Sequence, residues 1–150
     1  MGTRLRQAIL LLSVAVGLFT GGWAGFAPHS FYSSFPGLTH AWVAVDGPYN
    51  EHLIRDVGAL YLGLAAGGIV ALLLKDPSGS RVLGGAWLVF GALHVGYHAQ
   101  HLDLLDPIDA WGTLLALAGC LAFALLLLPA RRRPAADATA GRHEHLAASR

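Results

Sequence analysis

Charged residues are scarce in this chain, and those present are unevenly spread. Asp, Glu, Lys and Arg make up 13% of its 150 residues, against about 25% in a typical soluble domain. They gather in short clusters between long uncharged runs, and the mean hydropathy is +0.53. This pattern argues against a water-soluble domain and favours a protein that crosses the membrane several times. The formal net charge of +1 gives no reason to expect a nucleic-acid partner.

Cysteine and the common catalytic motifs are also missing or nearly so. Cys120 is the only cysteine, so no disulfide can form within the chain, and its place in an apolar run predicts a packing role. The sequence holds no HExxH, no GxSxG, no CxxC and no glycine-rich phosphate loop. These absences favour a non-catalytic protein.

Four uncharged runs are long enough to cross a bilayer, whose core needs about 20 apolar residues in a helix. They predict an all-α, four-helix integral membrane domain over residues 1–130, with spans at about 7–26, 57–74, 82–102 and 110–130. The first run is longer than the apolar part of a signal peptide, so we expect a retained span. Residues 131–150 are small and polar, and we expect a disordered basic cytoplasmic tail.

The positions of lysine and arginine predict the orientation. In a four-span arrangement, nine of the ten Lys and Arg residues fall on one side, and Arg55 alone falls on the other. Because basic residues are retained on the cytoplasmic side, we expect both termini in the cytoplasm. The protein itself is expected in the cell membrane, which it crosses several times. Six acidic residues and six histidines then belong to the outer half.

The connections carry their own signals. Residues 27–50 hold three prolines and several aromatic residues, which excludes a spanning helix and fits an interfacial segment. Asn50 is a suitable N-cap for the second long helix, and residues 75–81 predict a polar turn. Three tryptophans are expected to anchor span ends at the interface: Trp23, Trp87 and Trp111.

Small residues recur every four positions in two of the runs. The stripes are Gly17, Gly21 and Gly25, and then Ala59, Gly63, Gly67 and Ala71. Such stripes let a neighbouring helix approach closely. Besides the lipid bilayer, they predict a homo-oligomer or a membrane-protein partner held through Gly-rich helix faces.

The third run contains three histidines and no charged residue. His94, His98 and His101 follow the spacing i, i+4, i+7, which places them in one stripe if the helix continues to residue 102. Ionisable side chains within a membrane are costly, so they indicate a functional site. The three histidines are the candidate metal ligands.

A second polar group opens the second long helix and would meet the histidines at the outer face. Glu51 pairs with Arg55, and His52 with Asp56, at i, i+4 spacing. Four interpretations remain open for the combined cluster. It binds a transition metal, it ligates haem, it relays protons in redox or transport chemistry, or its hydrogen bonds only hold helices together.

Two segments of the chain resemble those of a known family. The segments GPYNEHLIRDVGALYL and HVGYHAQHLD, within a four-span layout, resemble a family of small actinobacterial membrane proteins, and the layout is similar to DoxX-like four-helix proteins. The resemblance covers about residues 5–130 and implies the topology. It implies no activity, so the function we expect is that of a non-catalytic membrane component with a histidine and carboxylate cluster near the outer face.

Overall fold

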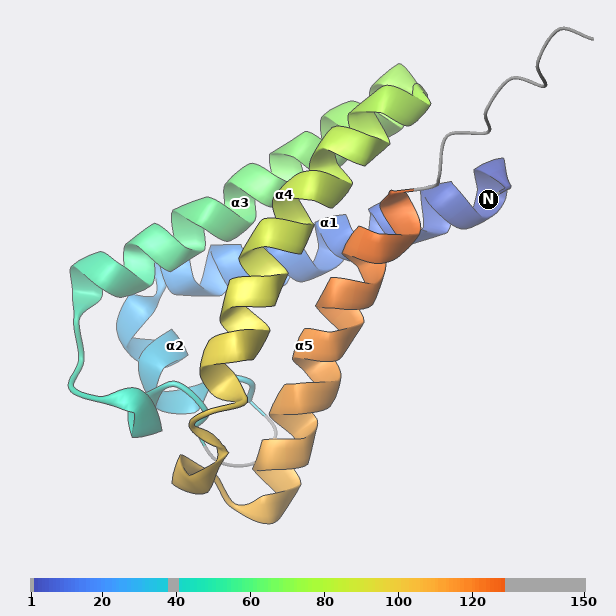
Figure 1. Cartoon of the computed structure of the whole chain (residues 1–150). Coiled ribbons are helices and arrows are strands. Elements are labelled where there is room, and N and C mark those ends of the chain that lie inside the picture. The colour runs from blue at the N-terminus through green and yellow to red at the C-terminus, as the bar shows by residue number, and fades with distance from the viewer. Residues whose placement is uncertain (1, 38–40, 129–150) are drawn as a thin grey trace, which may run out of the picture.

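A computed structural model describes residues 2–37 and 41–128 and is all-helical over these ranges, as predicted (Figure 1). The described residues form five α-helices and two short 3-10 helices, and no strand: α1 Thr3–Phe26, α2 Pro28–Ser34, η1 Ala44–Asp46, α3 Glu51–Leu74, α4 Pro77–His98, η2 Leu102–Leu104 and α5 Pro107–Leu127. The tail predicted at 131–150 lies outside the described residues.

Three of the long helices can cross a membrane by length and composition: α1, α3 and α5. Many large apolar side chains point outward from the bundle; Leu73, Val82 and Ile108 are 74%, 76% and 77% exposed. Contact of such side chains with lipid tails is favourable, whereas their exposure to water is unfavourable. The architecture is therefore compatible with a multi-pass membrane protein.

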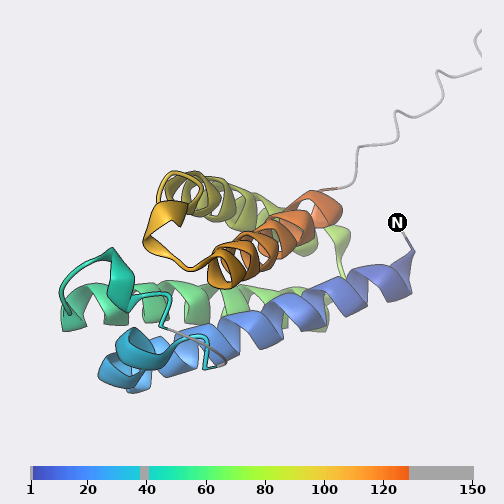
Figure 2. The same cartoon turned by 90° about the horizontal axis from the view of Figure 1, so that it is seen from below.

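The long helices pack as two pairs. Helix α1 lies along α3, and α4 lies along α5, so that the pairs form two layers (Figures 1 and 2). A core of buried residues joins the layers: Ile9, Leu10, Tyr61, Leu64, Ala71, Leu83, Trp87, Ala124 and Leu127. Cys120 packs against this core, in agreement with its predicted role.

Glycines bring α1 and α3 into backbone contact, along what we call the α1–α3 seam (Gly17, Gly21, Gly25 and Gly58). A Cβ added at Gly17 would lie 2.9 Å from the Tyr61 carbonyl oxygen. One added at Gly58 would lie 2.4 Å from the Gly25 nitrogen. The predicted stripe on α1 thus packs against α3 of the same chain.

Helix α3 turns a different set of small residues toward the core. Gly58, Ala65 and Gly68 are buried, whereas Ala59 and Gly63 of the predicted stripe are exposed. A Cβ added at Gly63 would meet nothing within 4 Å. The predicted stripe on α1 therefore packs within the chain, whereas Ala59, Gly63 and Gly67 of the predicted stripe on α3 are exposed and Ala71 is buried.

Capping residues set the helix ends. Asn50 accepts a hydrogen bond from the Leu53 amide at 3.1 Å, which confirms the predicted N-cap of α3. Lys75 ends α3 in the left-handed region with φ of 55°. Asp76 then caps the next helix and Pro77 occupies its first turn, so residues 77–81 are helical rather than the predicted turn.

The end of α4 also differs from the prediction. The helix stops at His98, and a turn leads into η2, so the span does not continue to residue 102. His101 has φ of −128° and ψ of 26°, outside the helical region, and it leaves the stripe of the other two histidines. Trp87 is fully buried beside Tyr61, not placed at the interface. Because α4 begins at residue 77, position 87 lies in its middle.

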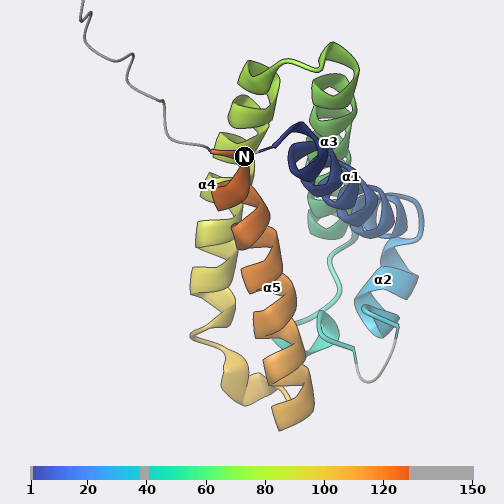
Figure 3. The same cartoon turned by 90° about the vertical axis from the view of Figure 1, so that its right-hand side faces the viewer.

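The two ends of the bundle differ in charge. At one end, which we call the basic end, lie the start of α1, the α3–α4 turn and the end of α5 (Figures 1 and 3). Its described Lys and Arg residues are Arg4, Arg6, Lys75 and Arg81. Arg6 Nη2 donates to the Lys75 carbonyl oxygen at 3.2 Å, which joins the start of α1 to the end of α3.

Candidate functional site

The opposite end, called the polar end, is built from four segments of the chain. These are the end of α1 with α2, the segment 41–50 with η1, the start of α3, and the connection from α4 through η2 to α5 (Figure 1). The acidic residues of this end are Asp46, Glu51, Asp56, Asp103, Asp106 and Asp109. Arg55 is its only Lys or Arg among the described residues. His40 lies outside the described residues.

Arg55 ties the start of α3 to the end of α1. Its Nε donates to Glu51 Oε1 at 2.8 Å, and its Nη1 donates to the Gly25 carbonyl oxygen at 2.5 Å. The carbonyls in the last turn of a helix lack partners within the helix, and they carry the negative end of its dipole. A cation placed there satisfies one carbonyl and stabilises the junction.

The other two members of the predicted cluster form a separate pair. His52 Nε2 lies 3.3 Å from Asp56 Oδ2, and these side chains are 88% and 62% exposed. Exposed pairs of this kind contribute little to stability. The structure therefore forms both pairs that the i, i+4 spacing predicts, Glu51 with Arg55 at the junction and His52 with Asp56 on the surface. Next to the junction, partial burial and the Glu51 carboxylate raise the pKa of the Tyr49 hydroxyl.

A buried carboxylate fastens the segment 41–50 to α5. Trp42 Nε1 donates to Asp109 Oδ1 at 2.9 Å, and Asp109 is only 2% exposed. The Trp42 ring also rests on Gly112, where an added Cβ would lie 3.0 Å from ring atom Cζ2. Trp42 lies in the segment 27–50 that is predicted to be interfacial, but no local sequence pattern links it to Asp109, 67 positions away.

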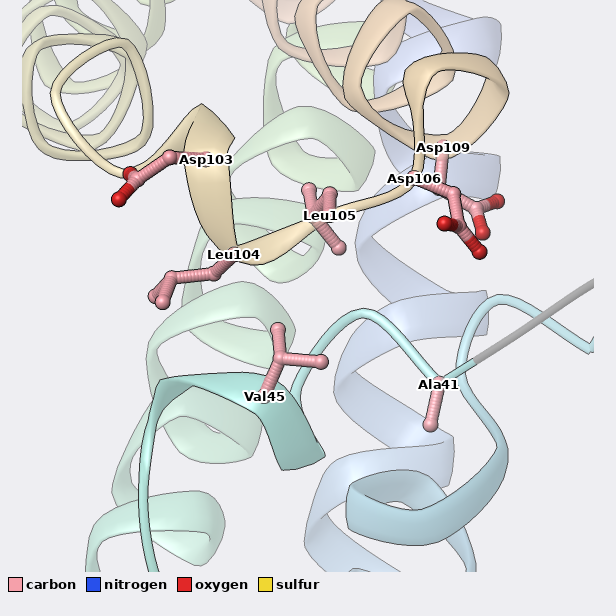
Figure 4. A pocket seen from close by; sticks show the side chains of 7 residues that line it. All are labelled: Ala41, Val45, Asp103, Leu104, Leu105, Asp106 and Asp109. Atoms are coloured by element: carbon pink, nitrogen blue, oxygen red, sulfur yellow. The ribbon is translucent and has the colours of Figure 1, made fainter.

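A shallow cavity of about 350 Å³ lies beside this contact, between η1 and the α4–α5 connection (Figure 4). Its lining residues are Ala41, Val45, Asp103, Leu104, Leu105, Asp106 and Asp109. The side chains of Val45 and Leu105 point into the middle of the cavity, and those of Asp106 and Asp109 lie at one edge. Asp103 points away at the other side.

The histidines of α4 belong to a continuous row of aromatic rings. His94 stacks on Phe90 with centroids 5.0 Å apart, and His98 meets His94 edge to face at 4.8 Å. Both imidazoles are half-buried. We call Phe90, His94 and His98 the histidine face of α4.

His101 is held differently from the other two. Its ring stacks on Tyr97 at 4.2 Å, and its Nδ1 lies 2.8 Å from the Tyr97 carbonyl oxygen. As the carbonyl can only accept, Nδ1 must carry the proton in this contact. The Tyr97 carbonyl oxygen, which also accepts from the Gln100 amide at 3.0 Å, thus holds the His101 ring in place.

The structure brings only part of the predicted metal site together. Asp46 of η1 lies close enough to His98 for its charge to act on the imidazole. In the ranges 2–37 and 41–128, no group of three or more His, Cys, Asp or Glu side chains is arranged to hold a metal ion. The three-histidine ligand set stays a prediction, and the two histidines of α4 are its geometrically coherent part.

Comparison with family models, with curated proteins and with solved structures finds no match. The resemblance stated from the sequence therefore stays a prediction, and the function must be argued from the site itself.

Proposed function

We propose that this chain is an integral membrane protein that crosses the cell membrane four times, with both termini in the cytoplasm and the polar end outside. Helix α4 is the fourth span. It has 22 residues, a length of about 33 Å at 1.5 Å per residue, which matches the hydrocarbon core. It also runs from the basic end to the polar end alongside α5, which is one of the three apolar helices.

The distribution of charge between the two ends carries this proposal. The basic end holds Arg4, Arg6, Lys75 and Arg81, whereas the polar end holds Arg55 among the described residues. Arg55 is moreover engaged with a carboxylate and a carbonyl. Segregation of this kind supports a cytoplasmic basic end, because lysine and arginine are retained on that side.

For the biochemical role, we propose a non-catalytic membrane component whose polar end forms a rigid outer cap rich in histidine and carboxylate. The junction of Arg55 with Gly25 and the contact of Trp42 with Asp109 support this role, since both fasten connections to helices. Association with a second copy or another membrane protein stays part of the proposal. The exposed Ala59 and Gly63 of α3 leave small-residue surface for it, while the α1 stripe is used within the chain.

Topology reporters test the four-span arrangement. A reporter that is active only outside the cell should be silent after Arg150 or in the Lys75–Asp76 turn. It should be active after Gly47 and after Asp106. Activity at the C-terminus would contradict the four-span arrangement, and with it the outer location of the polar end.

A second candidate function, ligand binding in redox or transport chemistry, is favoured by the contact between His94 and His98. The arrangement suits a metal ion better than haem. Two histidines one turn apart on a single helix lie on the same side of any ligand, and they cannot occupy both axial positions of one porphyrin. A proton relay along the ring row is the remaining alternative.

A further inference from the structure

The distance between His94 and His98 is already close to that of a chelating pair. Their centroids are 4.8 Å apart with the ring planes at 85°. Two imidazoles that share a tetrahedral ion, each with a metal–nitrogen bond of about 2.0 Å, would have centroids about 5 Å apart. Because the rings now meet edge to face, they must rotate about their side-chain bonds before a nitrogen of each faces one ion, whereas the spacing on α4 already suits it.

The surroundings of the pair limit its motion and offset the charge of a cation. Phe90 stacks on His94 with the ring planes at 20°, which restricts that imidazole on one side. Asp46, contributed by η1, places a carboxylate near His98. In a site with partial access to water, a nearby anion lowers the cost of holding a dication.

We infer that His94 and His98 form a two-histidine chelate for a divalent first-row transition ion. Among these ions Cu²⁺ should bind most tightly, in keeping with the general order of affinities for nitrogen ligands. Asp46 acts on the bound charge rather than as an assigned ligand. The inference deepens the second candidate function, and it rests on the proposed topology only for the side of the membrane that the ion reaches.

Two protein ligands leave at least two coordination positions open. Structural metal sites use four protein ligands and are closed, whereas sites with open positions admit water or another ligand. The chelate on α4 therefore suits an ion that is taken up and passed on at the outer face. It does not suit an ion that holds the fold together, because both histidines belong to one helix.

His101 is excluded from the ligand set, which makes the inference sharper than the three-histidine prediction. It lies beyond the end of α4, and its ring is held on Tyr97. Its Nδ1 donates to the Tyr97 carbonyl oxygen at 2.8 Å and leaves Nε2 to bind an ion, so the exclusion rests on the position of the ring. A three-histidine site needs His101 to leave its stacking contact and return to the stripe, while the pair on α4 needs only rotation of its side chains.

The test is a Cu²⁺ titration of the full chain, purified in detergent, followed by calorimetry and electron paramagnetic resonance. His143→Gln and His145→Gln form the background, so that the tail histidines do not bind the ion, and excess glycine suppresses binding at the backbone. We expect one Cu²⁺ per chain with hyperfine coupling to two imidazole nitrogens. Glutamine replaces each ligand because it keeps hydrogen-bonding capacity but binds transition metals poorly.

The variants should separate into three groups. His94→Gln and His98→Gln should each weaken Cu²⁺ binding by more than about 100-fold, and Asp46→Asn should weaken it by much less, because Asp46 acts only through its charge. His101→Gln should leave affinity and spectrum unchanged. Circular dichroism and gel filtration establish that each variant is folded before titration.

Several outcomes overturn the inference. Absence of stoichiometric Cu²⁺ binding by the folded background protein is one, and an effect of His101→Gln as large as that of His94→Gln is another. Unchanged binding in the folded His94→Gln, His98→Gln double variant is a third. None of these bears on the reporter experiment, so failure of the chelate and failure of the four-span topology are distinguishable.

Discussion

The α1–α3 seam and the histidine face of α4 belong to one bundle but are packed in opposite ways. At the seam, backbones touch, and an added Cβ at Gly21 would lie 2.8 Å from the Leu62 nitrogen. At the histidine face, polar rings meet edge to face and remain half-buried. The seam has no room for change and defines the fold. The histidine face has imidazole nitrogens that can bind a ligand.

Gly58→Ala should break this comparison most severely. Its new Cβ would meet the backbone of Gly25 at 2.4 Å, so α1 and α3 must separate. Overpacking against backbone should lower the free energy of unfolding in detergent by about 3 kcal/mol or more. Gly22→Ala on α1 is the matched control, because an added Cβ there meets nothing within 4 Å. Equal melting temperatures for the two variants would show that the seam is not packed as described.

Trp42→Phe should have the next largest effect, since it removes a donor from a buried carboxylate. The shorter phenyl ring lacks the indole atoms Cζ2 and Cη2 that contact Gly112, and Asp109 loses the indole hydrogen bond. We expect a loss of about 2 kcal/mol in thermal unfolding. Trp111→Phe, at a position 67% exposed, is the control and should change little. A result with the two variants reversed would contradict the tether between the segment 41–50 and α5.

Arg55→Ala should cost about 1–2 kcal/mol, because the Gly25 carbonyl and the Glu51 carboxylate both lose their cation. The side chain is 48% exposed, which keeps the effect below that of a buried pair. Arg55→Lys should restore part of the loss. Asp56→Ala tests the division of the cluster, and its melting temperature should equal that of the parent. An equal loss for Asp56→Ala would show that the two pairs act as one cluster.

Replacing His94, His98 and His101 together by glutamine should have the smallest effect on stability. Ring contacts at partly exposed positions and the hydrogen bond of His101 to Tyr97 are lost, and glutamine can replace the latter, which amounts to about 1 kcal/mol in total. The variant should therefore fold like the parent by circular dichroism while losing Cu²⁺ binding. Unfolding of the triple variant would mean that the histidine face is a structural element, as the seam is.

Much of the fold follows from local patterns. The long apolar runs predict the four long helices, and Asn50 predicts the start of α3. The differences at the start of α4 and at Trp87 have one source, since hydropathy marks the length of an apolar run and not the residues that cap a helix. Asp76 and Pro77 start the helix five residues before the apolar run. That early start places Trp87 in the core.

The site could be predicted less well, because its contacts join distant parts of the chain. The i, i+4 rule anticipates Glu51 with Arg55 and His94 with His98. It cannot anticipate that Arg55 reaches the Gly25 carbonyl, 30 positions away, or that Trp42 reaches Asp109. It also assumes a continuous helix, which is why His101 was grouped with the other two histidines.

The hydrogen bonds of Arg6 and Arg55 to backbone carbonyls also fix the position of α1 along α3. Arg6 holds the end of α3 at one surface, and Arg55 holds the end of α1 at the other. Both helices have 24 residues, about 36 Å each. Sliding one helix past the other by a single turn, about 5.4 Å, would break both bonds. If α1 and α3 span a bilayer thinner than their length, the pair must tilt or the lipid around it must change thickness, because the two helices cannot slide past each other. Under the proposed topology, a change in bilayer thickness therefore changes the tilt of this pair and not its length.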